Sequence, residues 1–76
     1  MEKELVEYIA NNLVNDPEQV RVNSKKTGSS TTIELHVASE DMGRVIGKQG
    51  RVANAIRSLL RVIAVRDDTR ITLEID

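Results

Sequence analysis

"VIGKQGR", residues 45–51, places two glycines on either side of a lysine and a glutamine, between two apolar segments. A bend alone would need only one glycine. A residue without a Cβ lets the backbone approach a ligand closely, and Lys48 and Arg51 add positive charge at the same place. A helix that begins at Arg51 would also direct unpaired N–H groups and the positive end of its dipole toward this turn. The stretch therefore predicts an anion-binding turn, with a purely structural turn as the alternative.

Hydrophobic spacing on both sides of this turn predicts the helices and strands. Apolar residues recur at helical spacing over 2–14 and over 51–65. They alternate with polar residues over 31–38 and 71–75, as in strands with one buried face. The long helix carries a core-facing stripe at i, i+4, i+7, i+8 and i+11, which consists of Val52, Ile56, Leu59, Leu60 and Ile63. The remaining expected elements are a short strand at 20–23, a short helix over 40–46, and loops at 15–18, 25–30 and 66–69.

The order of these elements is α-β-β-α-α-β. Three strands with apolar inner faces, covered on one side by helices, make a two-layer α+β sandwich. Ser39 is expected to cap the short helix, with Glu40 and Asp41 in its first turn, where acids favour the helix dipole. A chain of 76 residues suffices for one domain and not for two, so 1–76 is expected to be a single domain.

Composition excludes several classes of chemistry. The chain has no cysteine, hence no disulfide, thiolate zinc site or cysteine nucleophile. His36 is the only histidine and has no partner for a metal site or a nucleophilic pair, and no carboxylate pair is placed for acid–base work. We therefore expect no enzyme, no metal and no cofactor. The charged start and the lack of a ~20-residue apolar run predict a soluble protein of the cytoplasm.

Charge is concentrated in one segment, although the net charge is only −1. Residues 42–66 hold six basic side chains and no acidic one, so the rest of the chain, with five basic and twelve acidic residues, carries −7. Such a face attracts polyanions, whereas the plainer alternative is a solvated helix surface. The six are Arg44, Lys48, Arg51, Arg57, Arg61 and Arg66.

A nucleotide-binding P-loop does not fit this pattern. That motif reads G-x-x-x-x-G-K-[ST] and joins a strand to a helix. Here Gly43 lies one residue too close to Gly47, and Gln49 stands where a metal-binding hydroxyl is needed.

The run Val45-Ile46-Gly47-Lys48-Gln49-Gly50, followed by Ile56, resembles the IGxxG signature of the KH domain. The element order is similar to the bacterial type II arrangement, and the length resembles the small single-KH RNA-binding proteins of bacteria, the KH domain protein A family. KH domains clamp the backbone of about four single-stranded nucleotides with the GxxG loop.

This resemblance implies a role for particular residues. Gly47, Lys48, Gln49 and Gly50 would grip the backbone, Val45, Ile46 and Val52 would line an aliphatic groove for bases, and Arg44 and Arg51 would contact phosphates. Arg70 and the turn at 66–69 would border the other side of the groove. The position three after Gly50, bulky in most KH domains, is Ala53 here, which implies a shallower groove.

The chain's single aromatic residue, Tyr8, supports this mode of binding. Other single-strand readers stack bases on aromatic platforms, which this chain does not have. A nucleic-acid binder without aromatics needs an aliphatic groove and hydrogen bonds instead.

The apolar arc of the long helix is wider than a core contact requires. Ala55 and Val62 extend it from the usual ~100° to about 180°. Either both residues pack under the first helix, or they form an interface together with Leu59, for a second copy or for a related KH protein. The resemblance to small single-KH proteins also implies self-association.

These observations give a leading hypothesis and two alternatives. The leading one is a cytoplasmic single-stranded RNA-binding protein, acting as an RNA chaperone or post-transcriptional regulator. The alternatives are a protein–protein adaptor or dimerisation module with weak or no nucleic-acid binding, and a single-stranded DNA binder. None of them involves a membrane or a small-molecule substrate.

Overall fold

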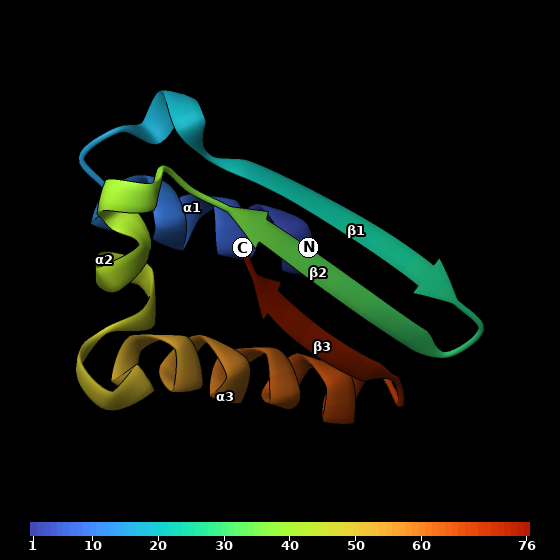
Figure 1. The fold of residues 1–76 in the computed structure, drawn as a ribbon. Helices are drawn as coiled ribbons and strands as arrows, with labels where there is room; N and C mark the ends of the chain where they lie inside the picture. The colour runs from blue at the N-terminus through green and yellow to red at the C-terminus, as the bar shows by residue number, and fades with distance from the viewer.

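The computed structural model describes all residues from 1 to 76 and has the expected order of elements. Helix α1 (Glu2–Leu13) precedes strands β1 (Arg21–Thr27) and β2 (Ser30–His36). Helices α2 (Met42–Ile46) and α3 (Arg51–Arg66) follow, and strand β3 (Arg70–Ile75) ends the fold (Figure 1). Three short 3₁₀ turns lie between them, η1 (Pro17–Gln19), η2 (Ser39–Asp41) and η3 (Lys48–Gly50). The predicted α-β-β-α-α-β order and α+β class are confirmed.

The three strands form one mixed sheet in the order β1-β2-β3. β1 pairs with β2 antiparallel, whereas β2 pairs with β3 parallel, with Ile33 opposite Leu73. Parallel neighbours need a long crossover, because the chain must return to the starting end of the sheet. The crossover here is α2, the glycine turn and α3, so the turn lies at an outer corner of the molecule (Figure 1).

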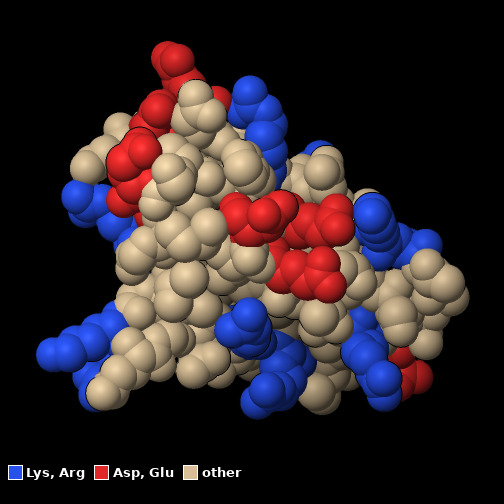
Figure 2. Space-filling model, viewed as in Figure 1, with Lys and Arg blue, Asp and Glu red and all other residues tan.

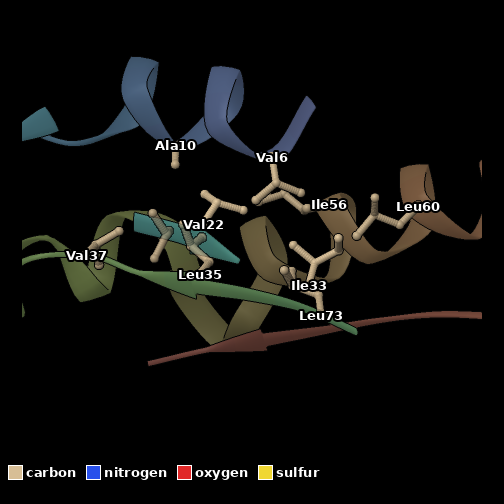
Figure 3. Packing of buried hydrophobic residues seen from close by; sticks show 10 residues of the cluster. Val6, Ala10, Val22, Ile33, Leu35, Val37, Ile56, Leu60 and Leu73 are labelled. Atoms are coloured by element: carbon tan, nitrogen blue, oxygen red, sulfur yellow. The ribbon is translucent and has the colours of Figure 1, made fainter. Parts of the chain in front are cut away.

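The core lies between the sheet and the helices on one of its faces. Val6 and Ala10 of α1 and Ile56 and Leu60 of α3 meet the inward side chains of the strands (Figure 3). The inward strand residues are Val22, Ile33, Leu35 and Leu73. The opposite face of the sheet has no helix over it. The helix periodicity therefore identified the covering elements correctly.

Two details of the prediction are wrong. The expected loop at 25–30 is mostly strand, because only Gly28 and Ser29 turn, with Gly28 at φ +60°, and the ladder continues to Thr27 opposite Ser30. Leu59 does not belong to the core stripe and is 49% exposed. The buried side of α3 consists instead of Ala53, Ile56, Leu60 and Ala64, which places Leu59 on the flank.

Candidate functional site

The glycine turn between α2 and α3 is held in a conformation that few residues can adopt. Gly47 has φ +78° and ψ 172°, a region that is essentially restricted to glycine. A Cβ built on Gly47 would lie 2.5 Å from Val52 Cγ2 and 2.8 Å from the Val52 backbone nitrogen. Gln49 and Gly50 follow at φ +58° and +76°, both left-handed. The turn is therefore a defined corner rather than a flexible link.

The amides of this corner are partly used within the turn. The Gly50 N–H donates to the Gly47 carbonyl at 3.1 Å, and the Arg51 N–H donates to the Lys48 carbonyl. Among the N–H groups at the start of α3, which were expected to be unpaired, that of Arg51 is therefore already used by the 3₁₀ turn. The dipole of the 16-residue helix α3 and the charged side chains also favour an anion at this place.

The side chains at the corner divide into exposed and supporting groups. Lys48, Gln49 and Arg51 are exposed, and Ile46 (36% exposed) and the half-buried Val52 supply aliphatic surface beside them. Val45 was expected in the groove but is 0% exposed, because the inner side of α2 packs it into the core. It therefore lies beneath the site and offers no surface to a ligand.

Arg44 is oriented by a buried carboxylate that the sequence analysis assigned to the helix dipole. Asp41 is 2% exposed, and its Oδ1 lies 3.4 Å from Arg44 Nε. Its two oxygens also accept hydrogen bonds from the backbone N–H groups of Asn15 (3.1 Å) and Asp16 (3.0 Å). Only Nε of Arg44 is engaged, which leaves its two terminal nitrogens for a phosphate.

The cap predicted for the short helix is also different in the structure. The Ser39 hydroxyl donates to Glu40 Oε1 at 3.0 Å, and the segment from Ser39 to Asp41 is a 3₁₀ turn before α2 begins at Met42. Asp41 thus connects α2 to the segment after α1. In the sequence, the only indication of this ion pair is that Asp41 lies three residues before Arg44. The backbone partners of Asp41 lie about 25 residues earlier in the chain, so no local pattern predicts them.

Arg70 and the turn before it lie at the far end of α3 from the glycine corner. The 16 residues of α3 span about 24 Å at 1.5 Å per residue. Arg70 opens onto a groove of about 340 Å³ between α3 and β3, which Arg57 and Arg61 also line. Arg70 therefore lies away from the corner, and Arg57 and Arg61 carry positive charge along α3 between the two.

Basic and acidic side chains occupy different parts of the visible face. Figure 2 shows Lys and Arg around the glycine corner at the lower left and along the lower margin, where Figure 1 draws α3. Acidic side chains gather over the centre of the sheet and at the upper left. The basic side chains of this margin stand in separate groups with uncharged atoms between them, and one acidic group lies at the lower right.

The exposed side of α3 carries the apolar residues that were expected either to pack under α1 or to form an interface. Ala55 is exposed, Leu59 is 49% exposed and Val62 is 67% exposed. Packing of Ala55 and Val62 under α1 is therefore excluded in this conformation. The three residues form a stripe on the surface of the helix.

Other kinds of site find no support in the fold. None of the helices combines the length and the apolar composition that crossing a membrane requires. No three acidic or histidine side chains converge as a metal site would need.

Comparison with known proteins gives consistent matches over nearly the whole chain. The model of a family described as KhpA/KhpB, KH domain, matches residues 3–75. The RNA-binding protein KhpA of Clostridium perfringens is 49% identical over 73 residues, which cover 96% of this chain and 97% of that protein. The RNA-binding protein KhpA of Caldanaerobacter subterraneus is 51% identical over 72 residues, 95% of this chain and 96% of that one. The protein of the same name from Listeria monocytogenes is 48% identical, with 96% of each chain covered.

Proposed function

The chain belongs to the KhpA/KhpB KH domain family, and from this premise we propose that it binds single-stranded RNA and grips the RNA backbone at residues 47–50. The resemblance read from the sequence is confirmed at the level of the family. The family is non-enzymatic, in agreement with the expectation that the chain is not an enzyme.

The observation that carries the proposal is the glycine corner itself. Its backbone is fixed by Gly47 against Val52, and Lys48, Gln49 and Arg51 are exposed around it. A sugar-phosphate chain can approach this corner closely at Gly50, which has no Cβ and where the nearest atom to one would be Asn54 Nδ2 at 3.7 Å. Relatives that share about half of the residues are named RNA-binding proteins, which favours RNA over DNA as the ligand.

Around the corner, the surface offers both charge and apolar area. Arg44, Lys48 and Arg51 are placed to contact phosphates, and Ile46 and Val52 to contact bases. Three phosphate contacts give a slope of log affinity against log salt near −2, at about −0.7 per contact on a single strand. Binding to one site is therefore weak and sensitive to salt, which suits an RNA chaperone or post-transcriptional regulator in the cytoplasm.

Replacing Lys48 and Gln49 by aspartate tests the proposal. Two like charges facing the phosphates should lower the affinity for a four-nucleotide RNA at least tenfold. Both side chains are exposed, so the circular dichroism spectrum and the unfolding midpoint should not change. Fluorescence anisotropy measures the affinity. The matched control is Lys3→Asp/Asn11→Asp, which changes the net charge by the same amount at exposed positions of α1. Equal affinity for wild type and Lys48→Asp/Gln49→Asp would contradict the proposal. Tighter binding of a four-nucleotide single-stranded DNA than of the RNA would assign the site to single-stranded DNA.

We also propose that the protein associates through α3, either with a second copy of itself or with a related KH protein. Ala55, Leu59 and Val62 form an apolar stripe that nothing in the protomer covers. Pairing two weak RNA sites can raise avidity by ~10²- to 10⁴-fold without new contacts to RNA. If the protein is instead an adaptor that binds RNA weakly, the same stripe would be the surface that contacts its protein partner.

Light scattering on Val62→Asp tests this association. A dimer of the wild type at tens of micromolar should become a monomer, because the aspartate would be buried without a partner in the interface. The control is Arg61→Asp next to it on the helix, which changes charge without removing apolar area. A wild type that is already a monomer at this concentration argues against self-association.

A further inference from the structure

Asp41 connects the segment after α1 to a cation beside the glycine corner. The helix does not continue into this segment, where Asp16 precedes Pro17 and is held outside the helical region at φ −124° and ψ 76°. The N–H groups of Asn15 and Asp16 donate instead to the two carboxylate oxygens of Asp41, at 3.1 and 3.0 Å. The carboxylate is thus anchored by a segment that lies about 25 residues earlier in the chain.

The same carboxylate faces Arg44, which lies three residues later in α2. Oδ1 of Asp41 is 3.4 Å from Arg44 Nε, and the side chain of Asp41 is 2% exposed whereas that of Arg44 is 51% exposed. A buried carboxylate needs hydrogen bonds and a cation to offset its lost hydration, and Asp41 has both. Asp41 is therefore the fixed member of this pair, and the exposed guanidinium is oriented by it.

The other two cations at the corner have no such support. Neither Lys48 nor Arg51 belongs to any of the ion pairs of the protein. Each of them must lose side-chain freedom when it meets a phosphate, and this loss opposes binding. Arg44 is already held at Nε, and its two terminal nitrogens stay free, so a phosphate contact costs it less entropy.

The distance between Arg44 and the corner suits a contact with the same ligand. α2 has five residues, and the Gly47 N–H closes it by donating to the Gly43 carbonyl at 2.8 Å. Arg44 lies three residues before Gly47, about 4.5 Å along the helix axis at 1.5 Å per residue. Its guanidinium is therefore within reach of a phosphate at the corner.

We propose that Asp41 is a positioning residue for RNA binding, which holds Arg44 for a phosphate contact and couples that contact to the segment of Asn15 and Asp16. RNA on Arg44 and the hydrogen bonds of Asn15 and Asp16 then stabilise each other through the carboxylate, because coupling between two sites is reciprocal. This proposal rests on the proposed function and adds to it a residue that itself contacts no RNA.

A double-mutant cycle of Asp41→Asn and Arg44→Gln tests the positioning. The probes are fluorescein-labelled oligoadenylate and oligouridylate of four nucleotides, measured by anisotropy at a temperature where circular dichroism shows each variant folded. One phosphate contact on a single strand contributes about 0.7 to the salt slope, which is about fivefold in affinity at 100 mM salt relative to 1 M. We expect each single variant to lose about fivefold in affinity and about 0.7 of the slope. The double variant should lose no more than Arg44→Gln alone.

A merely structural role of Asp41 predicts a different result. Damage to the fold would weaken binding whether or not Arg44 is present, so the double variant would lose about 25-fold. That result would overturn the positioning, and so would equal or tighter binding by Asp41→Asn than by wild type. The matched control is Glu40→Gln, which removes the same charge from an exposed neighbour and should keep its affinity within about twofold.

Amide hydrogen exchange of the wild type, measured by NMR, tests the coupling without a variant at Asp41. The N–H groups of Asn15 and Asp16 should exchange at least about threefold more slowly when the tighter-binding tetranucleotide saturates the protein. The Val14 N–H, which donates to the Ala10 carbonyl at 3.1 Å, is the internal control and should not change. In Arg44→Gln at the same saturation, RNA should not slow the exchange of Asn15 and Asp16. Unchanged exchange of both amides in the wild type would overturn the coupling.

The failure of this inference is distinguishable from the failure of the proposed function. Absence of binding of either tetranucleotide to the wild type would overturn both. Loss of binding in Lys48→Asp/Gln49→Asp, together with wild-type affinity and salt slope in Asp41→Asn, would overturn only the positioning by Asp41.

Discussion

At Gly47 the backbone excludes every side chain for two independent reasons. Its φ and ψ lie in a region open only to glycine, and a Cβ would collide with the backbone nitrogen of Val52 at 2.8 Å. Gly47→Ala should therefore lower the free energy of unfolding by about 2–4 kcal/mol, from backbone strain and overpacking together, and should weaken RNA binding. Chemical denaturation and anisotropy measure the two effects.

Gly50→Ala is the natural comparison for this substitution. A Cβ there meets nothing closer than Asn54 Nδ2 at 3.7 Å, so only the left-handed backbone opposes it, at a cost of about 1 kcal/mol. Equal losses of stability in the two alanine variants would show that the contact with Val52 is not what fixes the corner.

Asp41 gives the second prediction at the scale of the residue. Its carboxylate satisfies two backbone amides, those of Asn15 and Asp16, and pairs with Arg44. Asp41→Ala should lower the free energy of unfolding by about 2–4 kcal/mol, because each abandoned amide costs about 1–3 kcal/mol when it is poorly solvated. Glu40→Ala removes an exposed carboxylate next to it and should change stability by less than about 0.5 kcal/mol. A similar effect of both variants in thermal and urea unfolding would contradict the role assigned to Asp41.

At the scale of the element, helix α2 has two sides with different tasks. Val45 is buried in the core, whereas Ile46 is 36% exposed beside the corner. Val45→Ala should cost about 2 kcal/mol, from two lost carbon atoms and the cavity they leave, with little effect on the affinity of the folded protein for RNA. Ile46→Ala should do the reverse, with RNA affinity lowered about twofold to fivefold and stability nearly unchanged. If Val45→Ala weakens binding at temperatures where the variant is fully folded, Val45 contacts the ligand and its burial changes on binding.

The elements show which features a sequence can reveal. Helix α3 was predictable because its apolar residues repeat at the helical period, and the glycine corner because two glycines flank a cation. The far half of β1 was not, because Lys25 and Lys26 give no alternation of apolar and polar residues. Pairing across the hairpin, including the Lys25–Glu34 contact at 3.5 Å, makes this segment a strand. Leu59 and Val45 were misplaced because spacing identifies a helical face only to within about one residue, and the neighbour that covers the face decides the rest.

The candidate site shows that sequence patterns do not predict contacts between segments that are far apart in the chain. Residues 47–50 could be predicted locally, because the glycine turn is one continuous stretch of sequence. The support of Arg44 by Asp41, and the groove shared by Arg61 and Arg70, depend on segments that only the fold brings together. No spacing in the chain encodes them.

For the whole molecule, the arrangement of charge matters more than its total. A chain of net charge −1 would repel RNA weakly if the charge were spread evenly, yet residues 42–66 hold six cations and no acid. Salt screens the field of each charge beyond about 8–10 Å at physiological ionic strength, so an anion at the glycine corner would be attracted mainly by the nearby cations. Affinity should therefore follow the local surface and not the net charge.

Two variants that change the net charge in opposite directions test whether RNA affinity depends on the local surface charge or on the net charge. Glu7→Gln/Glu18→Gln raises the net charge by two at positions in α1 and η1, away from the basic segment. It should leave the affinity for four nucleotides within twofold and the salt slope near −2. Lys48→Gln/Arg51→Gln lowers the net charge by two at the corner and should reduce the slope to about −0.7, the value for one remaining phosphate contact. For the wild type, this reasoning gives a loss of about 20-fold in affinity between 50 and 200 mM salt. If the two variants shift the affinity by equal amounts in opposite directions, the molecule attracts RNA through its total charge, and the glycine corner has no electrostatic advantage over the rest of the surface.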